Sequence, residues 1–364
     1  MKYLFIIQGE GRGHLTQAIS MSAMLRRNGD DVTEILVGKA KSVVIPDFFS
    51  KKIQSPISTF ESPGFLFSPK SKKTILLKTI FHNLKKFPDY IKSIRFLKKK
   101  INESDADMVV NFYELMTGLT YAFTRPNKPY VCVAHQYLFF HPEFIFPKKS
   151  KLHLASLNFF TRLTCFRAEK LLALSFRSMA DWGKIRIVPP LMQREVKEQK
   201  FEVGDYVLGY MLNAGFAEQI TEWHNQNKNV PLHFFWDKKD APAELKIDDT
   251  LTFHRLNDVK FVQMMAGCMA YATTGGFESV CEALYLQKPA MMIPVHIEQE
   301  CNAFDAMHSG AGIACDEFNL TKLLQFLPVY RPDTTFGDWV NRADEFFLKE
   351  LKTENRKLTW RKSA

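Results

Sequence analysis

The stretch with the most residues able to do chemistry is Thr273 to Ala303, which reads TTGGFESVCEALYLQKPAMMIPVHIEQECNA. An apolar run of strand length precedes it, and Gly275-Gly276 then turns the chain into a helical apolar pattern. Glycines at such a turn let a ligand approach the backbone, and the first amides of a helix lack intrahelical partners. With the positive end of the helix dipole behind them, these amides predict a site for a phosphate or diphosphate.

Polar side chains continue this stretch. Glu282 lies one to two turns into the predicted helix, where a carboxylate can accept hydrogen bonds from a ribose diol. A second strand-like run, 290–293, stops at Pro294 and leads into a dense polar set. That set comprises His296, Glu298, Gln299, Glu300 and Asn302. Taken in order, these pieces favour a ligand site over an ordinary β-α-β unit with a polar surface.

A second glycine-rich turn lies near the start of the chain. It runs from Gly9 to Gly13, between a buried strand pattern and a helical pattern. A dinucleotide-binding fingerprint would require glycine where His14 stands. The next strand also ends in Gly38-Lys39, without an acid to hold a ribose. The turn therefore argues against an oxidoreductase.

The ordered set in 273–303 resembles the donor-site signature of GT-B glycosyltransferases, of the UDP-glycosyltransferase and MurG-like kind. The pieces that carry the likeness are the glycine turn, the helix with Glu282, Lys288-Pro289, Pro294, and Glu298 to Ala303. The resemblance implies that Thr274, Gly275, Gly276 and Ser279 meet the diphosphate and that Glu282 meets the ribose. It also assigns Glu298 and Gln299 to the sugar hydroxyls, includes Asn302 in the donor set, and places the nucleotide base at the loop beginning at His254. Two residues depart from the pattern: Thr274 stands where many members have His, and Glu278 where some have Asn.

The N-terminal turn resembles the glycine-rich loop of the same transferases, in which a histidine faces the cleft. By this resemblance His14 is the general base that takes a proton from an acceptor hydroxyl. An imidazole suits the task because it accepts a proton near neutral pH without a permanent charge. Glu10 is expected either to orient His14 or to contact substrate. Ordinary loop roles remain the alternative for both residues.

Polar residues also follow two further strand patterns, Met108 to Phe112 and Tyr130 to Ala134. Glu114 comes after the first, and His135 with Gln136 after the second. The carboxyl ends of strands in a parallel α/β sheet line the ligand crevice, so we expect these three residues on the acceptor side. A structural role for His135 stays open.

The elements that must position these residues form an α/β pattern. The 364 residues exceed one typical core and predict two domains. Pro189-Pro190 and the charged run 194–200 indicate a linker. The resemblance implies a GT-B fold, with two Rossmann-like doubly wound domains facing a cleft. We expect an acceptor domain at 1–190, a nucleotide-sugar domain at 191–334, and a helical tail at 335–364 that returns to the first domain. Strands are expected at 4–7, 32–37, 108–112, 130–134, 171–174, 185–188, 206–212, 232–236, 251–254, 269–272 and 290–293.

The net charge of +10 is concentrated in one region. Residues 70–100 contain eleven Lys and Arg side chains against the single acid Asp89, interleaved with large apolar residues. Such a mixture at helical spacing is typical of an interfacial helix resting on an anionic membrane, and it suggests a lipid-linked acceptor. A second basic and apolar patch follows at 144–151. A solvated helix face is the alternative, and no nucleic-acid motif accompanies the bases.

Compartment and cofactors follow from what the sequence contains. The six cysteines are scattered without a C-x-x-C spacing, so we expect reduced thiols and no metal site. The run 3–7 is too short for the apolar region of a signal peptide, and no run has the length to cross a bilayer. We expect a cytoplasmic protein, peripheral at the inner membrane face. By resemblance it needs no bound metal or cofactor, since the nucleotide-sugar is a substrate.

The sequence thus predicts a glycosyltransferase that moves a sugar from a nucleotide-sugar, with UDP the expected nucleotide, to an acceptor hydroxyl by inversion. One alternative is a nucleotide-sugar 2-epimerase of the same fold. Another is a non-catalytic membrane-surface protein that retains the nucleotide-sugar pocket.

Overall fold

The computed structural model describes residues 1–64, 83, 85–212, 214–238, 240–274 and 276–352. These residues form two compact units. The first contains the described residues of Met1–Phe144, Lys149–Leu191 and Trp339 onward. The second contains Ile145–Lys148 and Met192–Asp338. Each unit is built around one seven-stranded sheet with helices, which confirms the predicted fold class of two α/β domains.

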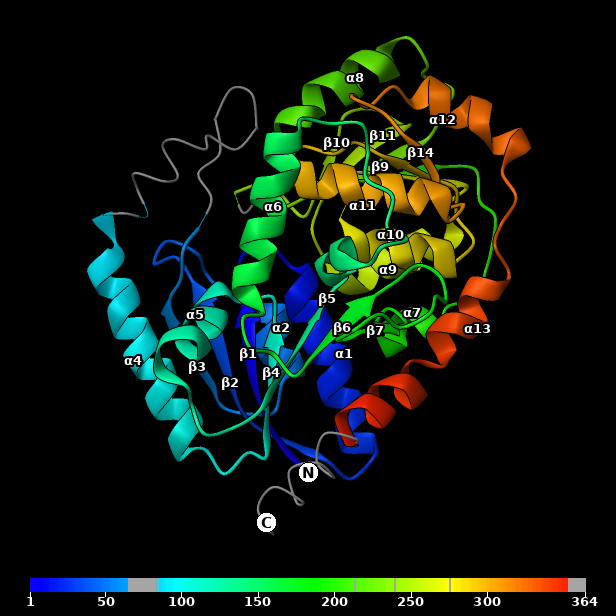
Figure 1. The fold of residues 1–364 in the computed structure, drawn as a ribbon. Helices are drawn as coiled ribbons and strands as arrows, with labels where there is room; N and C mark the ends of the chain where they lie inside the picture. Colours follow the sequence, from blue (N-terminus) through cyan, green and yellow to red (C-terminus); the bar gives the residue numbers. More distant parts are fainter. Residues whose placement is uncertain (65–82, 84, 213, 239, 275, 353–364) are drawn as a thin grey trace. The chain divides into compact units, whose positions relative to one another are not determined.

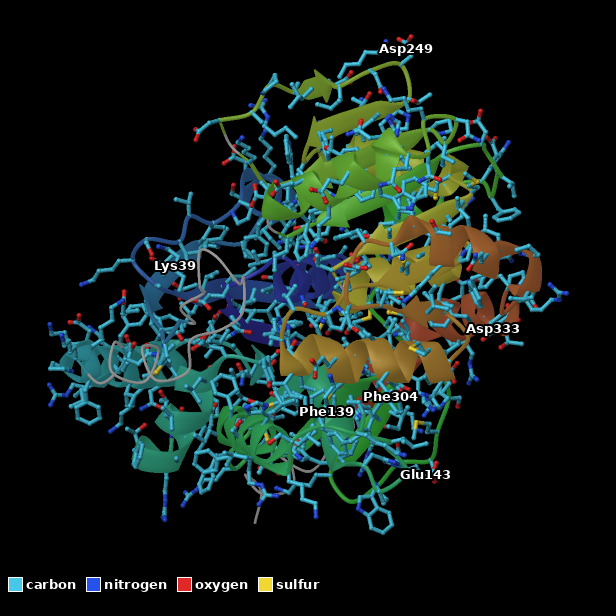
Figure 2. The ribbon with its side chains drawn as sticks, turned by 90° about the horizontal axis from the view of Figure 1, so that it is seen from above. Lys39, Phe139, Glu143, Asp249, Phe304 and Asp333 are labelled. Atoms are coloured by element: carbon cyan, nitrogen blue, oxygen red, sulfur yellow. The ribbon has the colours of Figure 1, made fainter. Side chains whose placement is uncertain are left out.

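The first sheet has the strand order β3-β2-β1-β4-β5-β6-β7, and all its pairs are parallel. The strands β1, β4, β5 and β6 are wholly or almost wholly buried apolar runs, as expected when helices cover both faces of a parallel sheet. Their bounds are β1 Lys2–Gln8, β2 Asp31–Lys39, β3 Ile57–Glu61, β4 Met108–Phe112, β5 Tyr130–Ala134, β6 Lys170–Leu174 and β7 Ile185–Val188. Figure 2 labels Lys39, the last residue of β2.

Helices cover both faces of this sheet (Figure 1). α4 contacts α5, and α5 contacts α6, while α1 contacts α2. Their bounds are α1 Gly13–Arg27, α2 Asp47–Lys52, α4 Phe87–Glu103, α5 Leu115–Thr124, η1 His135–Phe140 and α6 Lys151–Thr164. The basic segment predicted at 70–100 falls partly on α4, and its residues 70–82 and 84 lie outside the described residues.

The C-terminal part of the chain packs within the first unit. Residues 343–352 are helical and run beside α1, where Arg27 Nη2 lies 3.0 Å from Asp344 Oδ2 (Figure 1). Lys170 donates to the backbone oxygen of Glu350 at 2.9 Å and to its carboxylate at 2.8 Å, in a nearly buried pair. The indole of Trp339 donates to Ser175 O at 2.9 Å. These contacts tie the chain end to β6 and to the loop after it.

The second sheet has the order β10-β11-β9-β8-β12-β13-β14, parallel except where β10 meets β11. Alternate residues of β8 point to opposite faces, so Val207 joins one apolar core and Leu208 the other. The strands are β8 Val207–Met211, β9 Leu232–Trp236, β10 Glu244–Lys246, β11 Leu251–Arg255, β12 Ala270–Thr273, β13 Ala290–Met292 and β14 Gly312–Ala314. The helices are α7 Arg194–Lys197, η2 Ala214–Phe216, α8 Ala217–Asn225, α9 Asp258–Gly267, α10 Phe277–Tyr285, α11 Ile297–His308, α12 Leu320–Phe326, η3 Leu327–Val329 and α13 Thr335–Asn341.

Candidate active site

Each sheet has one point where the strand order reverses. In the first sheet it lies between β1 and β4, and in the second between β8 and β12. Ligands of open α/β sheets bind outside the carboxyl ends of the strands at this point, because the connecting helices leave in opposite directions there. The candidate residues after β1, β4 and β12 therefore occupy the positions that the fold reserves for ligands.

The glycine turn after β1 brings the chain against β2. The backbone N–H of Gly9 donates to Gly38 O at 2.7 Å, and a side chain on Gly9 would meet Val37 Cγ1 at 2.7 Å. Gly11 has φ +81°, in the left-handed region that favours glycine. The turn is thus built from glycines for close packing and a tight change of direction, and it delivers the chain into α1.

His14 is the second residue of α1. Its Nδ1 lies 3.2 Å from Gln17 Oε1, one turn along the same helix. An amide oxygen only accepts, so this contact puts the ring proton on Nδ1 and the lone pair on Nε2. The imidazole also stacks on Tyr113, with ring centroids 5.4 Å apart and an interplanar angle of 30°. The predicted base is therefore held on two sides, in the tautomer that a general base requires.

Tyr113, which we did not predict, has an unusual backbone. It follows β4 directly, is buried, and has φ 59°, a conformation that costs a bulky residue free energy. Its hydroxyl pairs with Thr161 Oγ1 at 2.7 Å, and its ring makes edge contacts with Tyr137 and Phe160. Strained residues persist only where their surroundings fix them, and they cluster at functional sites.

Asn111 supplies part of that restraint. Its Oδ1 accepts from the backbone N–H of Glu114 at 3.0 Å, and its Nδ2 donates to Glu114 O at 3.2 Å. Nδ2 also donates to Thr164 O at 2.8 Å. One fully buried amide thus closes the turn after β4 and fastens it to the end of α6. The sequence carried a signal, since Asn111 is a polar residue within an otherwise apolar strand.

Glu114 caps α5 and is completely buried. Its Oε1 accepts from Ser62 Oγ at 2.6 Å and from Met116 N at 3.0 Å. A side chain on Gly38 would collide with this carboxyl group, so glycine there leaves it room. Burial raises the pKa of Glu114 to about 7, the two hydrogen bonds oppose the shift, and the charge of Glu10 adds to it. Glu10 is half-buried beside Gly64, where a side chain would collide with its carboxylate.

His135 and Gln136 begin η1, directly after β5, and both are buried. Nδ1 of His135 lies 2.8 Å from Leu174 O, and because a carbonyl only accepts, this nitrogen carries the proton. Phe139, Phe144 and Phe176 present their edges or faces to the ring. These contacts fix the His135 ring in the interior of the first unit. An acceptor role for His135 stays a prediction.

In the second unit, the turn after β12 is tied to the end of β8. Thr274 is buried, and its Oγ1 accepts from Leu212 N at 3.3 Å. Gly275 lies outside the described residues, while the exposed Gly276 is the N-cap of α10. Ser279 Oγ lies 3.4 Å from Gly276 O within the first turn. The turn therefore delivers the amino end of α10 to the switch point, and the start of a helix favours an anion.

Two acidic residues lie on α10. Glu278 in the first turn and Glu282 further along are both half-buried. The segment predicted as an open polar set after β13 is the beginning of α11 instead. His296 is the N-cap and accepts from Gln299 N at 3.4 Å, while Gln299 Oε1 accepts from Val295 N at 2.9 Å. This reciprocal cap uses the amide oxygen of Gln299 to hold the helix end.

The remaining donor candidates are Glu298 and Asn302 on α11 and the Lys-Pro pair before β13. Glu298 is half-buried in the first turn of α11, and Asn302 is buried one turn later. Lys288 of the Lys-Pro pair is buried and donates to Cys268 O at 2.8 Å and to Glu202 O, so it fastens backbone segments together. The pair thus has a structural task in this unit.

His254 lies in β11, as expected from the predicted strand 251–254, but the strand continues to Arg255, so the loop predicted for the nucleotide base begins after that residue. Its Nε2 is 3.0 Å from His233 Nδ1, its Nδ1 is 3.2 Å from Lys260 Nζ, and its ring stacks on Phe235. Burial, followed by the charge of Lys260, lowers the pKa of His254 to about 4. Both ring nitrogens of the imidazole are engaged within the unit, and a contact with the nucleobase stays a prediction.

In the described ranges, no group of three or more His, Cys, Asp or Glu side chains is arranged to hold a metal ion. No helix of the described chain is both long and apolar enough to cross a bilayer.

Comparisons with known proteins agree with this architecture. A family model described as glycosyl transferase family 1 matches residues 1–330, and no curated protein matches the chain. The solved glycotransferase of kitacinnamycin is similar with a TM-score of 0.64 at 14% identity, over 98% of this chain and 99% of its own. The calicheamicin glycosyltransferase CalG4 gives 0.58 at 15%, over 95% and 94%. LpCGTa, solved in complex with UDP, gives 0.59 at 13%, over 94% and 93%. The likenesses confirm the two-domain GT-B fold.

Proposed function

Because the chain belongs to glycosyl transferase family 1 and is a glycosyltransferase, we propose that it transfers a sugar from a nucleotide-sugar to an acceptor hydroxyl with inversion. The observation that carries the proposal is the setting of His14. Its ring lies at the switch point of the first sheet, with Nδ1 against Gln17 and its face against Tyr113. A fixed imidazole with a basic Nε2 at that point is what proton removal from a bound hydroxyl requires.

The proposed reaction is a single displacement. His14 Nε2 takes the proton of the acceptor hydroxyl while its oxygen attacks the anomeric carbon. The bond between that carbon and the diphosphate oxygen breaks, and the electron pair leaves with the nucleoside diphosphate. The amino end of α10 supports the departing charge, since helix amides there have no intrahelical partners. Donors that are oriented before the charge develops cost no reorganisation in the transition state.

The donor side of the proposal rests on the second unit. Thr274, Gly275, Gly276 and Ser279 are assigned to the diphosphate, Glu282 to the ribose, and Glu298 with Gln299 to the sugar hydroxyls. UDP is the preferred nucleotide, and the similarity to LpCGTa, which was solved with UDP, supports this choice. Gln299 would act through its amide N–H groups, since its oxygen already caps α11. Asn302 would hold the same segment.

The acceptor side is proposed to take a lipid-linked alcohol, with the protein peripheral at a cytoplasmic membrane face. The exposed apolar side chains of the first unit support this, among them Phe123, Leu152 and Phe159. Glu10 and Glu114 lie on the acceptor side of the scheme, at the same sheet edge as His14.

A thermal-shift panel of UDP, GDP, ADP and their sugars tests the donor assignment. A ligand at a hundredfold excess over its dissociation constant stabilises the folded state by about 2.7 kcal/mol. We expect the melting temperature to rise with UDP and UDP-sugars. No rise with any nucleotide would contradict the donor site. Incubation of each UDP-sugar without acceptor completes the test, because an epimerase would convert the sugar and a transferase would not.

A further inference from the structure

The two helices α4 and α6 differ in how many apolar side chains they expose. On α4 the residues Tyr90, Ser93, Leu97 and Ile101 are buried, and Phe87 is the exposed large apolar residue among those described there. Three of the seven bases described between residues 83 and 100 have acidic partners as well. Lys86 lies 2.7 Å from Glu61, Lys100 lies 2.7 Å from Glu34, and Lys92 lies 3.0 Å from Asp89. The described part of the basic segment therefore packs its apolar face into the core and pairs three of its bases within the first unit.

The helix α6 shows the opposite arrangement. Only Leu157, Thr161 and Thr164 of its fourteen residues are buried. Leu152 is 76% exposed and Phe159, two turns later, is 65% exposed, with Ala155 and Ser156 exposed between them. Residues spaced by seven lie on the same side of a helix, so the two large side chains form one outward stripe. Phe166, just beyond the helix, is 43% exposed.

Along the chain, the charged residues of this helix and its flanks have one sign. From Lys149 to Ala168 the chain contains Lys149, Lys151, Arg162 and Arg167 and no acidic residue. Glu143, which Figure 2 labels on the loop before α6, and Glu169 are the nearest acids along the chain on either side. Lys151 and Arg162 are exposed, and at 100° per residue they lie on the same side of the helix, beside the stripe. Exposed apolar residues flanked by exposed bases match an anionic lipid surface, which offers hydrocarbon and negative charge at one interface.

The same helix also leads to the candidate base. Phe160 packs against Tyr113 with centroids 5.8 Å apart, Thr161 pairs with the Tyr113 hydroxyl, and Tyr113 stacks on His14. All these residues belong to the first unit. A membrane on the exposed side of α6 would thus contact a helix that is linked to His14 through a single residue, Tyr113.

We propose that the exposed side of α6, carrying Leu152, Phe159, Lys151 and Arg162, docks the protein on an anionic lipid bilayer. The apolar stripe enters the interface and the bases meet lipid phosphate groups. The inference rests on the proposed lipid-linked acceptor for its biological purpose, but docking itself requires neither donor nor turnover. A failure of docking and a failure of glycosyl transfer are therefore measured separately.

The test is cosedimentation of the full chain with vesicles of phosphatidylglycerol and phosphatidylcholine, compared with pure phosphatidylcholine vesicles. The wild type should bind the anionic vesicles and release them as salt rises. The double variant Leu152→Ser, Phe159→Ser should lose at least about tenfold in partition, since two large apolar side chains no longer enter the interface. The double variant Lys151→Glu, Arg162→Glu should lose a similar factor on anionic vesicles, because each base near such a surface contributes about fivefold.

Two control variants test whether substitutions outside α6 also affect vesicle binding. Val259→Ser removes a side chain that is 61% exposed on α9, and Lys92→Glu with Lys98→Glu reverses charge on α4. Both should bind vesicles like the wild type, and unchanged melting temperatures should show that every variant is folded. Failure of the wild type to bind anionic vesicles would overturn the proposal. So would wild-type binding by both α6 variants, or a loss confined to the α4 variant.

Discussion

The carboxyl edges of the two sheets present different chemical groups: side chains at the first and helix backbone at the second. At the first edge the chemistry lies in side chains: a fixed imidazole at His14, a strained tyrosine beside it, and a buried carboxyl group at Glu114. At the second edge the main asset is backbone, namely the amino end of α10, and side chains such as His296 and Gln299 hold helix ends in place.

The difference follows from the tasks proposed for the two edges. Removal of a proton requires a group whose proton affinity lies near neutrality, and only a side chain supplies it. A diphosphate requires several hydrogen-bond donors with fixed direction, which a helix start supplies without any particular side chain. Substitutions should therefore act sharply at the first edge and gradually at the second.

The largest expected effect is at His14. In His14→Ala no group remains to accept the acceptor proton, so transfer should fall by about 10²- to 10⁴-fold. UDP release from UDP-sugars, with a total lipid extract as acceptor source, measures this. UDP binding in the thermal-shift assay should persist, because the donor groups lie in the other unit. His308→Ala, at the exposed end of α11, is the control. Transfer at the wild-type rate in His14→Ala would show that the first edge does not depend on His14 as the base.

The buried carboxyl of Glu114 should appear as a pH dependence of stability. Its pKa is raised from 4.5 to about 7, so the folded state holds this proton more tightly than the unfolded state. Its stabilising contribution is therefore complete below pH 4.5 and is lost as pH rises through about 7. The loss between pH 5 and pH 8 should be about 2.5 kcal/mol.

Glu114→Gln removes this titration while it keeps an oxygen for the bonds from Ser62 and Met116. Urea unfolding at both pH values should show a smaller decline in the unfolding free energy for the variant than for the wild type. The exposed Glu103→Gln should leave the decline unchanged. An identical pH dependence in wild type and Glu114→Gln would show that the carboxyl titrates normally.

At the second edge, Glu282→Ala should weaken UDP binding by about tenfold, the cost of one charge-assisted hydrogen bond. The midpoint of the thermal shift against UDP concentration measures the change. Glu222→Ala, an exposed residue of α8 in the same unit, should bind UDP like the wild type. A complete loss of binding in Glu282→Ala would show that this edge depends on one side chain as strongly as the first edge does.

The smallest effect concerns the hydroxyl of Tyr113. Tyr113→Phe loses the bond to Thr161 but keeps the ring on His14, so stability should fall by about 1 kcal/mol while transfer stays near wild type. Tyr113→Leu removes the ring and should lower the rate further than its loss of stability explains. If the Phe variant loses transfer as His14→Ala does, the hydroxyl and not the stacked ring supports the base.

Sequence reasoning located most strands because buried parallel strands are continuous apolar runs. The strands at 108–112, 130–134, 185–188 and 232–236 match the structure residue for residue. β3, β10 and β14 escaped because they are short or partly exposed, so their apolar pattern is weak. α11 was read as a polar strand end, although His296 followed by acidic residues in the first turn is a helix start signal.

Candidate site residues could be predicted only where they belong to a sequence motif. The glycine turns and His14 have sequence signatures, whereas the restraint on His14 depends on the pairing of Tyr113 with Thr161, which lie 48 residues apart in the chain. His254 was correctly expected at the end of a strand, but its contacts were not predictable. Its partners His233 and Lys260 come from β9 and α9, and nothing local in the sequence indicates these contacts.

The return of the chain end to the first unit has a consequence for synthesis on the ribosome. Lys170 finds its partner only when Glu350 has been made, 180 residues later, after the whole second sheet has emerged. The second unit is thus an insertion that can complete its fold while the first still exposes the surface beside β6. Nascent chains should therefore acquire a compact second unit before the first becomes resistant to protease, in reverse of their order along the chain.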